Sequence, residues 1–139
     1  MYIRERANDL FANATRYNCC QAVVCAYCEF YGIEDTEIFK LAEGFGAGMG
    51  ALRDTCGAVT GMFMALGLHN SVGDKENPRA TKMDTYGAVR EYAQKFKDEC
   101  GSIYCRELKS TEGGKQLVSC QQCVDVAAKL VEEYINSKK

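Results

Sequence analysis

The sequence has one proline, one histidine and no tryptophan among its 139 residues. A single proline argues against a disordered chain and against a loop-rich all-β fold. The one histidine, His69, lies in a polar stretch over residues 69–76 that we expect to be an exposed loop. No Ser-His-Asp or Cys-His arrangement can therefore be built around it. These absences favour a helical fold and leave cysteine as the main candidate for reactive side chains.

Long hydrophobic runs and clustered basic residues are also missing. The apolar segment over residues 56–68 holds three glycines and is shorter than the ~20 residues that a membrane span requires. The net charge is −2, and no basic stripe could neutralise phosphates, which argues against nucleic acid as a partner. The charged beginning of the chain does not resemble a signal peptide. We therefore expect a cytoplasmic protein with reduced thiols.

Apolar residues recur with helical spacing along nearly the whole chain. The pattern predicts helices near residues 3–14, 19–31, 35–43, 56–68, 78–100, 103–108 and 120–134. Asn77-Pro78 is the expected start of the fifth, and residues 111–115 are an expected turn. Leu41, Met83 and Tyr86 are among the positions expected to face inward. We predict an all-α fold, a compact single-domain bundle of about six helices over residues 1–139.

Nine cysteines are the main anomaly of the composition: Cys19, Cys20, Cys25, Cys28, Cys56, Cys100, Cys105, Cys120 and Cys123. In a cytoplasmic helical protein they indicate metal-binding, catalytic or redox thiols. Because free cysteine is among the most often buried residue types, we expect about half of them to be small core residues. The Cys25-x-x-Cys28 pair falls in the middle of a helix, where a core or groove-lining role is expected.

Four cysteines lie at expected helix starts, each behind a residue that can cap the helix: Cys19 after Asn18, Cys56 after Thr55, Cys105 after Ser102 and Cys120 after Ser119. A helix start presents unpaired N–H groups and partial positive charge, which stabilise a thiolate. We therefore take these four as candidate catalytic thiols. Cys20 and Cys123 lie beside two of them and stand as alternatives to Cys19 and Cys120.

The glycines near Cys56 form a second feature. Gly57, Gly61 and Ala65 give one small-residue face to the fourth helix, suited to close approach of another helix or of a ligand or cofactor. Glycine also occupies every second position over residues 44–50. This run lacks the Lys-Ser/Thr of a phosphate-binding loop, and we expect it to bring backbone close to the thiols.

Several of these segments together resemble one known family. They are Asn18-Cys19-Cys20-Gln21-Ala22-Val23, Cys56-Gly57-Ala58-Val59-Thr60-Gly61, Ala65-Leu66-Gly67-Leu68, Cys105-Arg106-Glu107-Leu108 and Cys120-x-x-x-Val124. The chain resembles the C_GCAxxG_C_C family over nearly its whole length. The resemblance implies a short, redox-active prokaryotic protein with four characteristic cysteines. Members are often encoded near transporter genes, which implies a membrane transporter as one partner.

Three functions remain open from the sequence. In the first, Cys56 is the attacking thiolate of a dithiol/disulfide protein, with Cys19, Cys105 or Cys120 resolving, and no cofactor is required. Its partners would be a redox protein or a small thiol, and a homo-oligomer is compatible with it. In the second, the same four thiolates bind zinc or an iron–sulfur cluster. In the third, the chain is a non-enzymatic accessory protein of a transporter or binds a small anion.

Overall fold

The computed structural model describes residues 2–12, 16–109 and 118–138. Within them lie six helices of eight or more residues: α1 (Tyr2–Ala12), α2 (Cys19–Phe30), α3 (Thr36–Glu43), α5 (Gly57–Asn70), α6 (Lys82–Cys100) and α8 (Cys120–Ser137). Two segments of four residues, α4 (Gly46–Met49) and α7 (Cys105–Leu108), complete the described part. The predicted all-α fold of about six helices is confirmed.

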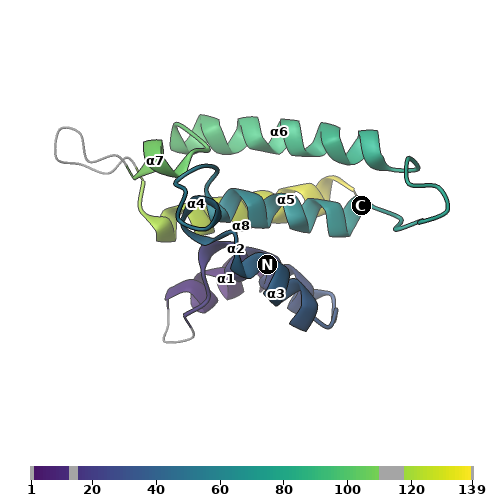
Figure 1. Cartoon of the computed structure of the whole chain (residues 1–139), viewed down its shortest axis with the longest axis horizontal. Helices are drawn as coiled ribbons and strands as arrows, with labels where there is room; N and C mark the ends of the chain where they lie inside the picture. The colour runs from purple at the N-terminus through teal and green to yellow at the C-terminus, as the bar shows by residue number, and fades with distance from the viewer. Residues whose placement is uncertain (1, 13–15, 110–117, 139) are drawn as a thin grey trace.

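In Figure 1 α6 lies at the top, α5 and α8 lie below it, and α1, α2 and α3 lie at the bottom. α1 packs on α2 and α8, and α2, α5 and α8 contact one another. α6 packs on α5 and α8 on one side, and α3 packs on α2 on the other. α4 and α7 lie together at one end, on the left in Figure 1, beside the starts of α5 and α8. No helix of the described residues is long and apolar enough to cross a membrane.

Two of the central helices begin with the capping boxes that the sequence predicts. The Asn18 side chain accepts a hydrogen bond from the Gln21 N–H group, and the Gln21 side chain accepts one from Asn18. Ser119 and Gln122 make the same reciprocal pair at the start of α8. Such a cap stabilises a helix by about 1 kcal/mol. It also places Cys19 and Cys120 at the first helical position.

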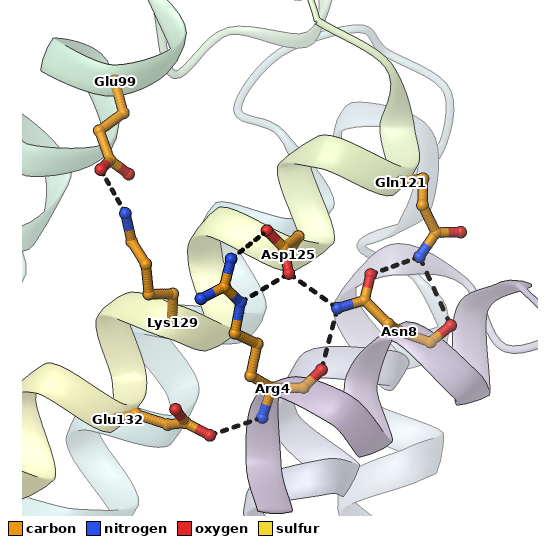
Figure 2. A network of polar contacts seen from close by, with 7 residues as sticks. All are labelled: Arg4, Asn8, Glu99, Gln121, Asp125, Lys129 and Glu132. Atoms are coloured by element: carbon orange, nitrogen blue, oxygen red, sulfur yellow. Dashed lines mark hydrogen bonds and ion pairs between the residues drawn. The ribbon is translucent and has the colours of Figure 1, made fainter. Parts of the chain in front are cut away.

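A polar network between α1 and α8 holds the first turns of α8 in place (Figure 2). Arg4 binds Asp125 at 2.8 Å, and Asn8 donates to the same carboxylate at 2.9 Å. Gln121, next to Cys120, donates to the Asn8 side chain at 2.6 Å. The first turn of α8 is thus held both by its own cap and by these contacts with α1.

α2 is the most deeply buried helix, and every residue from Cys19 to Cys28 is buried. Cys25 and Cys28 have no exposed surface, so the expected core role of this pair is confirmed. α5 approaches α2 through its small face, because a Cβ atom on Gly61 would lie 2.7 Å from the Cys20 carbonyl oxygen. The Gly57–Gly61 face therefore packs directly on a neighbouring helix.

The glycine-rich run forms a left-handed turn. Ala47, Gly48, Met49, Gly50 and Ala51 all have positive φ, between 53° and 71°. The Gly50 N–H group donates to the Gly46 carbonyl at 2.9 Å, which is the bond of one helical turn with the opposite hand. Only glycine adopts this conformation without cost. This explains the glycines at positions 48 and 50 and leaves strain at Ala47, Met49 and Ala51.

Four sequence expectations are wrong in detail. α6 begins at Lys82 behind Thr81, because residues 77–81 form turns instead of the expected Asn77-Pro78 helix start. Leu41, Met83 and Tyr86 are exposed, since α3 and α6 lie at the outside of the bundle and turn only one face inward.

Cys56 itself, and not Thr55, is the N-cap of α5. Tyr104, and not Ser102, is the N-cap of α7. Ala14 and the expected turn over residues 111–115 lie outside the described residues.

His69 is not in an exposed loop either. It belongs to the last turn of α5, where its Nδ1 atom lies 3.0 Å from the Tyr27 hydroxyl. Its ring also packs against Tyr31 and Tyr134. Burial lowers the pKa of His69, which favours the neutral ring. His69 therefore belongs to an aromatic cluster that is only partly buried, with Tyr31 at its exposed side.

Candidate functional site

The starts of α2, α5, α7 and α8 meet around one cavity of about 170 Å³. Five cysteines are among its lining residues: Cys19, Cys56, Cys105, Cys120 and Cys123. The four cysteines that the sequence places at helix starts are thus brought together, and Cys123 joins them. Cys20 is not among the lining residues, and its sulfur lies 3.8 Å from that of Met64 instead.

Backbone hydrogen bonds hold Cys56 and Cys105 side by side. An isolated antiparallel bridge pairs Thr55 with Tyr104. Around it, the Cys56 N–H group donates to the Ile103 carbonyl at 2.8 Å, and the Cys105 N–H group donates to the Asp54 carbonyl at 2.6 Å. The start of α5 is thereby joined to the start of α7, although the two cysteines are far apart in the sequence.

The left-handed turn closes one wall of the cavity with Ala47 and Gly48. A Cβ atom on Gly48 would lie 2.6 Å from the Cβ atom of Cys105, and one on Gly57 would collide with the Cys19 sulfur. Both positions therefore need glycine because cysteine side chains occupy the space. The expectation that the glycine run brings backbone close to the thiols is confirmed.

Hydrogen bonds connect three of the thiols, one between Cys19 and Cys56 and one between Cys56 and Cys123. The bond with Cys56 is the main cause that lowers the pKa of Cys123, against the effect of burial. The bond to Cys123, with burial, raises the pKa of Cys56 to about 12. The bond to Cys56 and burial likewise raise the pKa of Cys19. Of these three thiols, Cys123 is the one whose thiolate form is favoured.

Lys109 is the cation that faces Cys123. Its Nζ atom lies 3.5 Å from the Cys123 sulfur and 3.0 Å from the Val118 carbonyl oxygen. Burial alone would lower the pKa of Lys109, but the Cys123, Cys120 and Cys56 sulfurs outweigh burial and raise it. A second cation, Arg53, donates to the Cys105 sulfur over 3.7 Å. Neither residue was singled out in the sequence.

The five sulfurs differ in access to solvent. Cys120 is exposed, whereas Cys19, Cys56, Cys105 and Cys123 are buried. Cys120 and Cys123 form a Cys-x-x-Cys pair whose first member opens α8 and whose second member, one turn later, reaches the interior. The sequence indicates Cys123 only as an alternative to Cys120, whereas both line the cavity; their spacing directly behind the Ser119 capping box is the signal for the pair. A helix-start pair of this kind is typical of redox motifs, unlike the mid-helix Cys25-x-x-Cys28.

All nine cysteines are free thiols in the structure. As the side chains lie, the described residues include no group of three or more His, Cys, Asp or Glu side chains that could hold a metal ion.

Fold and cavity together define an all-α, cysteine-rich protein whose thiols gather at helix starts. Residues 17–134 match the family described as "Putative redox-active protein (C_GCAxxG_C_C)", and the chain belongs to this family. A protein of Archaeoglobus fulgidus, named "Uncharacterized protein", is 30% identical over 136 residues, covering 91% of this chain and 87% of its own length. No solved structure matches the chain.

Proposed function

We propose that this protein carries out thiol–disulfide exchange, with Cys56 and Cys123 as its redox couple and exposed Cys120 as the thiol that meets the substrate. The observation that carries the proposal is the position of the Cys123 sulfur, which contacts the Cys56 thiol and the Lys109 ammonium group in one cavity. Two sulfurs within hydrogen-bond reach need only a small movement to form a disulfide. Family membership supports redox chemistry in general.

In this proposal Cys56 is not the attacking thiolate that the sequence predicts. A thiol whose pKa is raised to about 12 is a poor attacking group at neutral pH, because the thiolate is the nucleophile. Cys56 therefore acts as the resolving thiol and as the hydrogen-bond donor that stabilises the Cys123 thiolate. Cys19, whose pKa is also raised, is hydrogen-bonded to Cys56 in turn.

The exchange proceeds in three balanced steps. Cys120, as thiolate, attacks one sulfur of a substrate disulfide, forms a mixed disulfide and releases the first substrate thiolate. The Cys123 thiolate then attacks the Cys120 sulfur and releases the second substrate thiolate. Cys56 next loses its proton and attacks Cys123, which forms the Cys56–Cys123 disulfide and returns Cys120 to the thiolate. The substrate gains two electrons and two protons, one from Cys56 and one from water, since Cys123 starts as a thiolate. A small thiol or a dithiol protein would reduce the couple again.

The test is the oxidation of the anaerobically reduced protein by hydroxyethyl disulfide, followed by thiol counting, intact mass and peptide mapping. We expect the wild type to lose a pair of thiols with no adduct, and the peptides of Cys56 and Cys123 to be joined. The Cys123→Ala variant should stall with one mercaptoethanol on Cys120. Cys25→Ala, a change in the core away from the cavity, should behave as the wild type.

Two outcomes would contradict the proposal. One is a wild-type protein that keeps all its thiols under these conditions. The other is stoichiometric zinc or iron in the protein as purified, which would make the same sulfurs metal ligands.

A further inference from the structure

The cavity lining contains two basic side chains and no carboxylate. Arg53 and Lys109 are the charged residues among those that line it, and both are positive. Among the described residues, neither of them forms a salt bridge with a carboxylate. The dipoles of α2 and α8 also point their positive ends toward this place, because Cys19 and Cys120 are the first residues of those helices. The electrostatics therefore favour an anion.

The two cations differ in exposure and in the partners that they already bind. Lys109 is half-buried and already bound to the Cys123 sulfur and the Val118 carbonyl. Arg53 is exposed, like Cys120, and its only described side-chain hydrogen bond is the long one to the Cys105 sulfur. Its guanidinium presents several further N–H donors, arranged to bind a carboxylate through two parallel bonds. Arg53 is thus the cation that is available to an incoming molecule.

The size of the cavity limits what can enter. Its volume of about 170 Å³ is below the roughly 300–1,000 Å³ that is usual for drug-sized ligands. The left-handed turn and the bridge between Thr55 and Tyr104 border it closely. A small molecule with a short arm fits such a space, whereas a folded protein would reach only Cys120 at the surface.

We propose that the substrate is a small disulfide with anionic arms, whose carboxylate binds Arg53 while its sulfur meets Cys120. This inference rests on the thiol–disulfide exchange proposed above and adds the class of substrate to it. Each turnover would reduce one disulfide of this kind to two mercapto acids, with the electrons coming from the Cys56–Cys123 couple. Arg53 acts in this scheme by binding the substrate and does not transfer electrons or protons.

The test compares three small disulfides of similar arm length: dithiodiglycolate, which is anionic, hydroxyethyl disulfide, which is neutral, and cystamine, which is cationic. The rate of thiol loss from the reduced protein is divided by the rate for free mercaptoethanol under the same conditions, to remove intrinsic reactivity. We expect the normalised rate for dithiodiglycolate to exceed that for cystamine by about tenfold or more at low salt, and the ratio to fall as salt is added.

Arg53→Gln should remove most of this preference. Arg106→Gln is the matched control, because it deletes the same charge from an exposed residue whose guanidinium lies over the Tyr104 ring and not in the cavity lining. Equal normalised rates for the three reagents, with a pair of thiols still lost, would overturn the substrate class and leave the exchange function intact. No thiol loss with any of them would overturn both.

Discussion

The Nζ atom of Lys109 lies 3.5 Å from the Sγ atom of Cys123, a thiol with no exposed surface. A buried charge is costly unless it is paired and hydrogen-bonded, and this contact supplies both conditions to the Cys123 thiolate. Lys109 directly follows α7, whereas Cys123 lies in the first turns of α8. The ion pair therefore also links two segments that meet at the cavity.

Replacing Lys109 by Met should raise the pKa of Cys123 by about one to two pH units, because an opposite charge within hydrogen-bond distance favours the charged form. In the wild type the Cys123 pKa is lowered, so its thiolate should persist to a pH below the range of ordinary thiols. The measurement is a pH titration that follows thiolate absorbance at about 240 nm. Circular dichroism checks that each variant stays folded.

Two further variants control this titration. Lys109→Arg keeps the charge and should keep the low pKa, whereas Lys95→Met removes a lysine that faces Glu133 and should change nothing. Since the Cys123 pKa is lower in the folded than in the unfolded state, its contribution to stability is present above the ordinary thiol pKa and lost as pH falls through the lowered value. An unchanged titration in Lys109→Met would refute the ion pair.

Replacing Cys56 by Ser should change the disulfide that forms and not merely its rate. Without a resolving sulfur at position 56, oxidation by hydroxyethyl disulfide should end at a Cys120–Cys123 bridge. Peptide mapping distinguishes this bridge from the Cys56–Cys123 bridge expected in the wild type. Cys20→Ser provides the matched control, because Cys20 is equally buried but does not line the cavity. If Cys56→Ser and the wild type gave the same bridge, Cys56 would not belong to the couple.

Two glycines of α5 should respond to alanine with opposite signs. At Gly61 an added Cβ atom would lie 2.7 Å from the Cys20 carbonyl oxygen, so Gly61→Ala should destabilise the protein by about 1–3 kcal/mol. At Gly67 nothing lies within 4 Å of such an atom, so Gly67→Ala should stabilise it by about 1 kcal/mol through helix propensity. Urea unfolding measures both. Equal effects would show that α5 does not pack on α2 at Gly61.

The left-handed turn makes a further prediction for stability. Ala51 is exposed and has a φ of 67°, a conformation that costs a residue with a Cβ atom about 1–2 kcal/mol. Ala51→Gly should therefore stabilise the protein by about 1 kcal/mol in urea unfolding. Ala80→Gly, in an exposed turn without positive φ, should have no such benefit and lose up to about 1 kcal/mol. A loss of stability in Ala51→Gly would argue against the turn.

The sequence by itself determined the local structure. The helical spacing of apolar residues predicts the all-α fold, and the Asn18–Gln21 and Ser119–Gln122 boxes place Cys19 and Cys120 at helix starts. These signals can be found in sequence because periodicity and capping depend on residues within one turn of each other. The same locality explains the misplaced start of α6, where a good cap at Asn77-Pro78 is not used by the fold.

Tertiary structure alone decided which cysteines meet and which of them has a lowered pKa. Contacts such as Cys56 with Cys123, or Lys109 with Cys123, join helices that are distant in the chain, and no local pattern encodes them. Helix-start reasoning favours a thiolate at Cys56, but the packed structure raises the pKa of Cys56 and lowers that of Cys123. A thiol pKa is determined by burial, hydrogen bonds and neighbouring charges together, and these exist only once the helices have packed.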